Sequence, residues 1–145
     1  MQLKDKVVIV TGANSGIGFT AAKAFIRKGA QTILACRNME KAEAALAEIK
    51  AAKPNAPAEI MELDLASLES VRNFAAAFKE KYDRLDLLIN NAGIMMVPYG
   101  LTDDGYERQF GTNHLGHFAL TGLLIDRIKA TPGARVVNVS SNAHK

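Results

Sequence analysis

Residues 7–18, Val-Val-Ile-Val-Thr-Gly-Ala-Asn-Ser-Gly-Ile-Gly, decide the fold of this 145-residue chain. The apolar, β-branched run at residues 7–10 stops at Thr11 and Gly12, which is typical of a strand buried on both faces of a parallel sheet. Helical composition begins at Gly16 and continues to about residue 28, where Gly29 supplies a helix stop. The stretch therefore predicts a strand, a glycine-rich turn and a helix.

The same alternation continues along the rest of the chain. Further strands are expected at residues 31–36, 59–63, 85–89 and 135–139, and further helices at residues 38–52, 67–81 and 104–130. Strictly alternating strands and helices imply a parallel sheet with right-handed crossovers and helices on both faces. We therefore predict one α/β domain over residues 1–145, with a doubly wound parallel sheet of about five strands.

Apolar spacing also predicts which side of each helix faces the sheet. In the first helix, the residues expected to lie on one inward face are Ile17, Ala21, Ala24 and Phe25. In the last helix, the residues expected to point inward are Phe110, Leu115, Phe118 and Leu123.

The composition excludes several classes of protein. Hydrophobic residues make up 48% of the chain and charged residues 23%, which excludes intrinsic disorder. A net charge of +3 is too small and too scattered to predict a nucleic-acid surface. No run approaches the roughly 18 apolar residues of a membrane span, and the single cysteine, Cys36, cannot form an internal disulfide. We expect a soluble, cytoplasmic protein without a transmembrane segment or nucleic-acid partner.

The histidines do not predict a metal site. His114 and His117 stand three residues apart on the last predicted helix, but no carboxylate or cysteine completes a ligand set with them. We interpret both as structural residues.

Gly12, Gly16 and Gly18 lie between the first predicted strand and helix. Ligands of doubly wound sheets bind beyond the carboxyl ends of the strands, and glycine lets backbone amides approach a pyrophosphate at the positive end of a helix. No Lys-Ser or Lys-Thr follows Gly18, which argues against a Walker-type loop. The spacing favours a dinucleotide site, and the alternative is a turn whose glycines serve only close strand–helix packing.

A second motif makes this interpretation more specific. The glycine spacing, followed by Asn90-Asn91-Ala92-Gly93 after the fourth strand, resembles the short-chain dehydrogenase/reductase family. Residues 35–38, 113–118 and 138–144 are most similar to its retinol-dehydrogenase-like branch. The resemblance implies a Rossmann fold and hydride transfer between a nicotinamide and a small, lipophilic alcohol, aldehyde or ketone. It also implies a seven-stranded sheet, of which this chain would be the cofactor-binding portion, incomplete at its C-terminal side.

The resemblance implies that cofactor contacts come from residues after the first four strands. Asp64 is expected to accept a hydrogen bond from the adenine amino group while the Leu65 amide donates to the ring. The alternative for Asp64 is a helix cap, for which Ser67 is better placed, and Asn90 is expected to be part of the scaffold. The expected cofactor-binding residues are Gly12, Asn14, Ser15, Gly16, Ile17, Gly18, Arg37, Asp64, Leu65, Asn91, Ala92 and Gly93.

The end of the second strand predicts the type of cofactor. An acidic residue there accepts a hydrogen bond from the ribose 2′-hydroxyl of NAD, but this chain has Cys36 followed by Arg37. A guanidinium pairs well with a 2′-phosphate through charge-assisted hydrogen bonds. We therefore predict NADP(H), and the alternative is a solvated arginine at a helix start.

Two catalytic residues are implied by the resemblance. Ser141 would orient the substrate, and Asn113 would hold a water in the family's proton relay. The alternatives are that Ser141 caps a following helix and that Asn113 is an ordinary polar helix residue.

The family's proton donor, a tyrosine followed four residues later by a lysine, has no match in these 145 residues. We therefore expect little turnover from this chain alone, and the alternative function is a nucleotide-binding fragment or interaction module without turnover. The residues four positions after Tyr82, Tyr99 and Tyr106 are Asp86, Asp103 and Phe110.

We also expect possible self-association through the edge of the fifth strand and the long helix, which would lack neighbours.

Overall fold

The computed structural model describes residues 2–144 of the chain. Strands and helices alternate along it, as the sequence predicts, with boundaries that differ from the expected ones by one or two residues for most elements. In chain order they are β1 (Val7–Thr11), α1 (Gly16–Arg27), β2 (Gln31–Cys36), α2 (Met39–Ala52), β3 (Ala58–Glu62), α3 (Leu68–Lys81), β4 (Leu87–Asn90), α4 (Arg108–Phe110), a π-helix (Gly111–Leu115), α5 (Gly116–Ala130), β5 (Arg135–Asn138) and a 3-10 turn (Asn142–His144).

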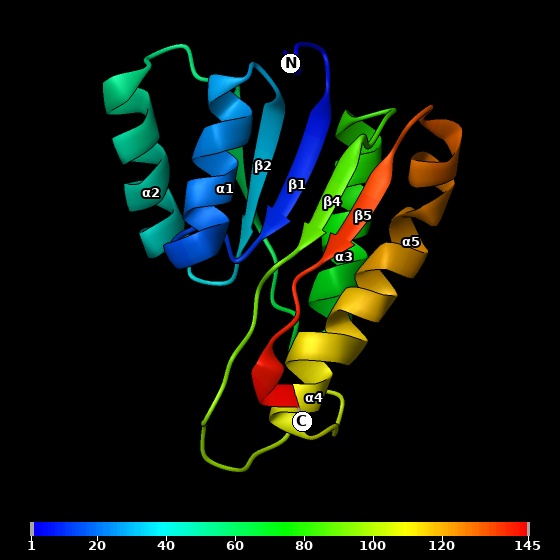
Figure 1. Cartoon of the computed structure of the whole chain (residues 1–145). Coiled ribbons are helices and arrows are strands. Elements are labelled where there is room, and N and C mark those ends of the chain that lie inside the picture. The colour runs from blue at the N-terminus through cyan, green and yellow to red at the C-terminus, as the bar shows by residue number, and fades with distance from the viewer. Residues whose placement is uncertain (1, 145) are drawn as a thin grey trace.

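The five strands form one parallel sheet in the order β3-β2-β1-β4-β5 (Figure 1). β1 is central because its neighbours on both sides are parallel strands, with Val10 in register with Leu34 of β2 and with Ile89 of β4. The strand order reverses direction between β1 and β4. The predicted doubly wound α/β fold of the Rossmann type is therefore confirmed.

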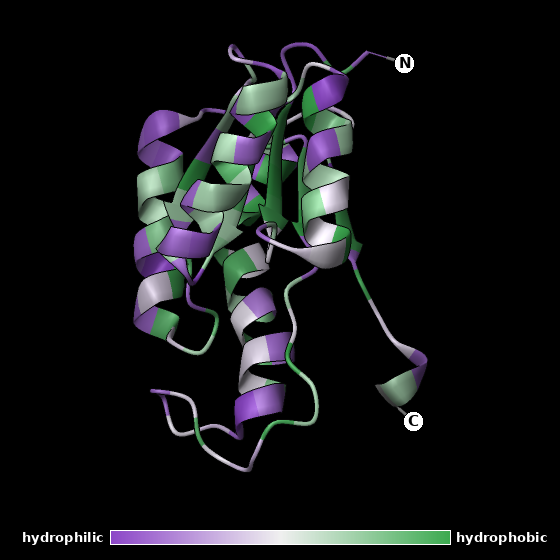
Figure 2. Cartoon of the chain, turned by 90° about the vertical axis from the view of Figure 1, so that its left-hand side faces the viewer, coloured by the Kyte–Doolittle hydropathy of each residue, from purple (hydrophilic) through white to green (hydrophobic). Residues whose placement is uncertain are grey.

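The sheet separates two apolar layers. On one side, Ile26 of α1 and Ile49 of α2 pack with Val8 and Val10 of β1. On the other side, Phe78 of α3 packs with residues of β1, β4 and α5. Figure 2 shows the strands as a mostly hydrophobic interior behind helices that carry hydrophilic residues outward. Burial of both sheet faces supplies the main driving force for this fold.

The inward faces predicted for the first and last helices are right in part: Phe25 and Leu123 pack against the two buried cores, but Ile17, Phe110 and Phe118 do not. Ile17 is 73% exposed and Phe118 is 74% exposed, and Phe110 is also exposed. α1 instead buries Gly18, Ala22 and Ile26, and the start of α5 buries Gly116 and His117. Close packing explains the difference, because a β-carbon on Gly18 would overlap the Gly12 carbonyl oxygen and one on Gly116 would overlap the Leu65 carbonyl oxygen.

The last helix also begins later than expected and is not continuous. Residues 103–106 form a turn and a bend, and α4 starts at Arg108, where the Glu107 carboxylate accepts hydrogen bonds from the amides of Gln109 and Phe110 at 2.9 and 2.8 Å. The π-helix Gly111–Leu115 then interrupts the α-helical hydrogen-bonding pattern. Such interruptions are frequent at functional sites.

The connector between β4 and α4 extends beyond the carboxyl ends of the strands, in the direction in which the strand arrows point (Figure 1). β5 occupies one edge of the sheet and pairs with β4. Within residues 2–144, every helix is too short or too polar to cross a lipid bilayer.

Candidate functional site

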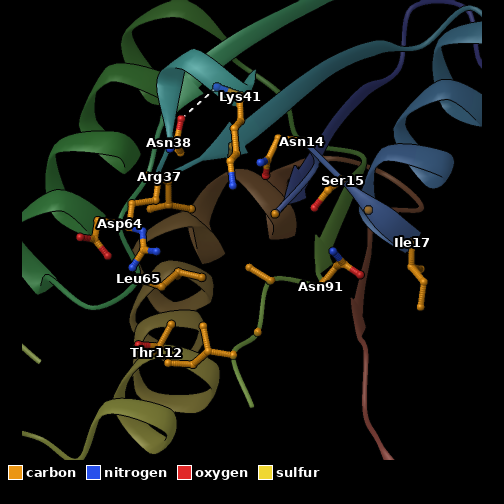
Figure 3. A pocket seen from close by; sticks show the side chains of 17 residues that line it. Asn14, Ser15, Ile17, Arg37, Asn38, Lys41, Asp64, Leu65, Asn91 and Thr112 are labelled. Atoms are coloured by element: carbon orange, nitrogen blue, oxygen red, sulfur yellow. Dashed lines mark hydrogen bonds between the residues drawn. The ribbon is translucent and has the colours of Figure 1, made fainter. Parts of the chain in front are cut away.

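A cavity of about 410 Å³ opens at the carboxyl ends of the central strands (Figure 3). It lies at the point where the strand order reverses, which is where doubly wound sheets bind their ligands. The structure brings together every predicted cofactor-binding residue except Gly16, which is not part of the lining. The lining residues that the sequence predicted are Gly12, Asn14, Ser15, Ile17, Gly18, Arg37, Asp64, Leu65, Asn91, Ala92 and Gly93.

The loop after β1 forms the part of the cavity next to α1. Gly12 and Gly16 have φ angles of +64° and +56°, a left-handed conformation that strongly favours glycine. Ser15 occupies the N-cap position of α1, and its side chain makes no capping hydrogen bond with the described residues. The first amides of α1 therefore have no side-chain cap, which is the arrangement in which a helix N-terminus binds an anion.

The segment after β2 contributes positive charge. Cys36 is buried, and burial raises the pKa of its thiol, while hydrogen bonds with the backbone of Ala13 and Asn14 act in the opposite direction. The position thus holds a neutral thiol where NAD-binding sheets carry an acid. Arg37 and Lys41 both line the cavity, and Figure 3 shows the Lys41 side chain extending into it.

The segment after β3 forms another wall of the cavity, and hydrogen bonds hold it in place. Asp64 Oδ1 accepts a hydrogen bond from the Ala66 amide at 2.9 Å, and the Asp64 amide donates to Ser70 Oγ at 2.9 Å. Ser67 caps α3 by accepting a hydrogen bond from the Ser70 amide at 3.3 Å. Ser67, and not Asp64, is therefore the N-cap of α3. The expected contact between Asp64 and the adenine stays a prediction.

The turn after β4 is fixed by its two asparagines. Asn90 Nδ2 donates to Thr121 Oγ1 at 3.1 Å and to Asn138 Oδ1 at 2.8 Å, so Asn90 ties β4 to α5 and β5 and has the expected scaffold role. Asn91 Nδ2 donates to the Thr11 carbonyl oxygen at 2.9 Å. Asn91 therefore joins β4 to β1 while it lines the cavity.

The two predicted catalytic residues lie outside this lining. Asn113 Oδ1 accepts a hydrogen bond from the Ile94 amide, and its Nδ2 donates to the Ile94 carbonyl, both at 2.8 Å. Asn113 also lines a separate groove together with Ser140. Ser141 is exposed, and its Oγ accepts a hydrogen bond from the Ala143 amide at 3.1 Å. Their roles in catalysis remain predictions.

Several residues that line the cavity were not predicted from the sequence. Lys41 could have been found, because it stands four residues after Arg37, at the start of a predicted helix. Asn38 also lines the cavity, and its Oδ1 caps α2 by accepting a hydrogen bond from the Lys41 amide at 2.9 Å. Ile94 and Thr112 reach the lining through tertiary packing, for which the sequence carries no local signal.

Comparison with known proteins identifies the family. The sequence matches the short chain dehydrogenase family over residues 6–145. The chain belongs to this family. It is 54% identical to human retinol dehydrogenase 13 over 142 residues, which cover 98% of this chain and 43% of that protein. The chain thus spans less than half the length of this curated relative.

Solved structures of short chain dehydrogenases and related proteins share the fold. An uncharacterized protein from Mycobacterium paratuberculosis superposes with a TM-score of 0.82 at 49% identity, covering 99% of this chain and 48% of that one. A Shigella flexneri protein solved in complex with NADP superposes with a TM-score of 0.78 at 28% identity, covering 92% of this chain and 58% of that one.

Proposed function

We propose that this chain is the cofactor-binding portion of an NADP(H)-dependent oxidoreductase that transfers a hydride between the nicotinamide and a lipophilic alcohol or carbonyl substrate. The observation that carries the proposal is the cavity at the strand ends, where uncapped helix amides and two cationic side chains line one space. When bound, NADPH supplies the hydride.

The loop after β1 suits the pyrophosphate. The first amides of α1 have no side-chain cap from the described residues and lie at the positive end of the helix. Gly12, Ser15 and Gly18 of this loop line the cavity, so a diphosphate in the cavity would lie beside the loop backbone.

Arg37 and Lys41 suit the 2′-phosphate that distinguishes NADP from NAD. Both side chains line the cavity, and the neighbouring Cys36 is neutral, so the end of β2 attracts a phosphate. The Shigella flexneri relative, solved in complex with NADP, supports this choice of cofactor. Asp64 and Leu65 would then contact the adenine, and Asn91, Ala92 and Gly93 would lie beside the nicotinamide ribose.

The substrate class is proposed from the relatives. Human retinol dehydrogenase 13, which is 54% identical to this chain, is named for retinol, a lipophilic alcohol. In the complete active site, Ser141 would orient the substrate oxygen and Asn113 would hold a water for proton transfer. Because Cys36 is the only cysteine and is buried and free, we also propose a cytoplasmic, reducing location.

A second candidate is nucleotide binding without turnover by this chain alone. None of its three tyrosines is followed four residues later by a lysine, so the usual phenol–ammonium pair is missing from these 145 residues. Loss of a general acid costs roughly a hundredfold to ten-thousandfold in rate. Incubation with NADPH and aldehydes separates the candidates, since oxidation of NADPH would show that other residues supply the proton.

Nuclear magnetic resonance tests the site itself. Addition of NADPH to ¹⁵N-labelled chain is expected to shift the amide signals of residues 12–18 and of Arg37 and Leu65. The amides of residues 76–81, at the opposite end of α3, serve as the internal control and should not move. Signals that shift only outside the cavity would overturn the proposed site.

A further inference from the structure

Thr11, the last residue of β1, is fully buried, and its hydroxyl oxygen lies within 2.9 Å of three polar groups. The amides of Asn91 and Ala92 each donate to Thr11 Oγ1 at 2.9 Å. His117 Nε2, from the first turn of α5, lies 2.8 Å from the same oxygen. One hydroxyl group therefore joins the central strand, the turn after β4 and the long helix.

The hydrogens of this network can be assigned from chemistry. His117 Nδ1 lies 2.9 Å from the Asn113 carbonyl oxygen, which can only accept, so Nδ1 carries a proton. In the neutral ring, Nε2 is then an acceptor, and the Thr11 hydroxyl donates to it. The two lone pairs of Thr11 Oγ1 remain for the amides of Asn91 and Ala92. Each donor and each acceptor of the network has one partner.

The alternative partner for the Thr11 hydroxyl is weaker. The Ile89 carbonyl oxygen lies 3.4 Å away, well beyond the 2.8 Å that separates the hydroxyl from His117 Nε2. Turning the hydroxyl toward Ile89 would also leave Nε2 without a donor in a side chain that is only 7% exposed. An unsatisfied buried polar atom costs about 1–3 kcal/mol, so the bond to His117 is favoured.

We propose that His117 is a positioning residue for the nucleotide cavity: by accepting a hydrogen bond from the Thr11 hydroxyl, it holds Thr11 Oγ1 as the double acceptor that fixes the Asn91–Ala92 turn. This inference rests on the proposed cofactor site, because the turn is one of its walls. His117 does not line the cavity and would act only through Thr11.

The position of this turn sets the shape of the glycine loop opposite. A β-carbon on Gly12 would lie 2.9 Å from Ala92 Cα, and one on Gly18 would lie 2.5 Å from Asn91 Nδ2. The turn and the loop therefore touch without space between them. A shift of Asn91 and Ala92 would therefore displace the glycine loop, whose amides would hold the pyrophosphate in the proposed site.

The surroundings of His117 keep its ring neutral. Burial lowers the pKa of His117, the hydrogen bond to the Asn113 carbonyl acts to raise it, and the nearby His114 lowers it further. The two groups that contact its ring nitrogens, the Thr11 hydroxyl and the Asn113 carbonyl, are both uncharged. Protonation of Nε2 would remove the acceptor for Thr11 and release the network at acidic pH.

The first test needs no variant and no nucleotide. At pH 7, the ¹⁵N spectrum of the His117 ring in the 145-residue chain is expected to show a proton on Nδ1 and none on Nε2. A proton on Nε2 would overturn the proposal. Because NADPH is absent, this result is independent of whether the chain binds the cofactor.

The second test compares three substitutions at one position. His117→Leu removes the acceptor, His117→Asn places its amide near Nδ1, and His117→Gln places an acceptor near Nε2. Hydrogen exchange of the Asn91 and Ala92 amides is expected to become about tenfold faster with Leu and Asn, as loss of one buried hydrogen bond predicts. Gln should restore most of the protection.

Controls separate local from global effects. The amide of Ile9, in the same strand as Thr11, should keep its exchange rate in each variant, and His114→Leu should leave the Asn91 and Ala92 amides unchanged. If NADPH binds the chain, its affinity should fall about tenfold in His117→Leu and recover in His117→Gln. Equal acceleration at Ile9, or no recovery with Gln, would overturn the proposal.

Discussion

Gly18 lies directly against Gly12, so that a β-carbon on Gly18 would overlap the Gly12 carbonyl oxygen and lie 2.5 Å from Asn91 Nδ2. Three segments, the end of β1, the start of α1 and the turn after β4, therefore meet at one point without room for a methyl group. The absence of a side chain at Gly18 is a packing requirement as well as a means of exposing backbone amides.

Gly18→Ala is expected to destabilise the chain by about 1–3 kcal/mol, because the overlapping atom belongs to the backbone and cannot rotate away. NADPH affinity should fall more than about tenfold, since the loop amides would be displaced. Chemical denaturation and nucleotide titration measure the two effects.

Gly122→Ala is the matched control. This exposed glycine lies within α5, and a β-carbon there would meet no described atom within 4 Å. The substitution should raise the free energy of unfolding by about 0.5–1 kcal/mol through helix propensity. Similar losses of stability at Gly18 and Gly122 would contradict the packing described above.

Lys41→Ala should weaken NADPH binding by about threefold to tenfold, as expected for a partly solvated charge beside a phosphate. NADH, which lacks the 2′-phosphate, should bind Lys41→Ala and the unmodified chain equally. Lys50→Ala removes the same charge from the last turn of α2 and should change neither affinity. Equal weakening of NADPH and NADH binding would contradict a phosphate contact.

Asp86→Asn tests the ion-pair cluster at the opposite end of the sheet. Asp86, 7% exposed, accepts a hydrogen bond from the Val7 amide at 2.9 Å and pairs with Arg84 and Lys6 at 2.8 and 3.1 Å. Burial acts to raise the pKa of Asp86, but the hydrogen bonds from Arg84, Val7 and Lys6 outweigh it and lower the pKa. The substitution should cost about 1–3 kcal/mol at pH 7.

The sign of the pH dependence follows from the lowered pKa of Asp86. As the pH falls through the ordinary aspartate pKa of about 3.9, the unfolded chain binds a proton before the folded chain does. The stabilisation is therefore complete above that pH and is lost as the pH falls through the folded pKa. Denaturation of Asp86→Asn should show a weaker acid dependence, whereas Asp83→Asn, at an exposed neighbour, should behave like the unmodified chain.

The order of strands and helices could be predicted from the sequence because the hydrophobic pattern of a buried strand differs clearly from that of an amphipathic helix. Continuous β-branched runs such as residues 7–10 and amphipathic segments such as residues 67–81 give strong local signals. The helix faces could not be predicted from hydrophobicity alone. Ile17 is more apolar than Gly18, but only Gly18 lets α1 approach the Gly12 carbonyl, and this contact depends on tertiary structure.

In the candidate site, too, some residues could be predicted from the sequence and others could not. The glycine turn, Arg37 and the Asn90–Gly93 turn follow strand ends, and the topology of parallel sheets places such residues together. The contact between His117 and Thr11, by contrast, joins residues 106 positions apart. No local pattern encodes such a pair, so the two histidines could be interpreted only as structural.

Self-association is expected from the exposed edge of the sheet. Val137 in β5, Val139 just after it and Phe118 on α5 are exposed, and β5 is an edge strand. A lysine at an edge strand opposes pairing with a second chain. We therefore propose that Val137→Lys shifts the chain toward monomer in sedimentation velocity, whereas Ala47→Lys, on exposed α2, does not. An unmodified chain that is monomeric at every concentration would contradict this prediction.

Calorimetric titration of the 145-residue chain with NADPH and with NADH tests the nucleotide site most directly. NADPH is expected to bind at least about tenfold more tightly, and Arg37→Ala should reduce NADPH affinity about tenfold to hundredfold without changing NADH affinity. Arg27→Ala, at the end of α1, is the matched control and should change neither. Equal affinities for the two nucleotides would contradict the choice of NADP(H), and the absence of heat with either one would contradict the site itself.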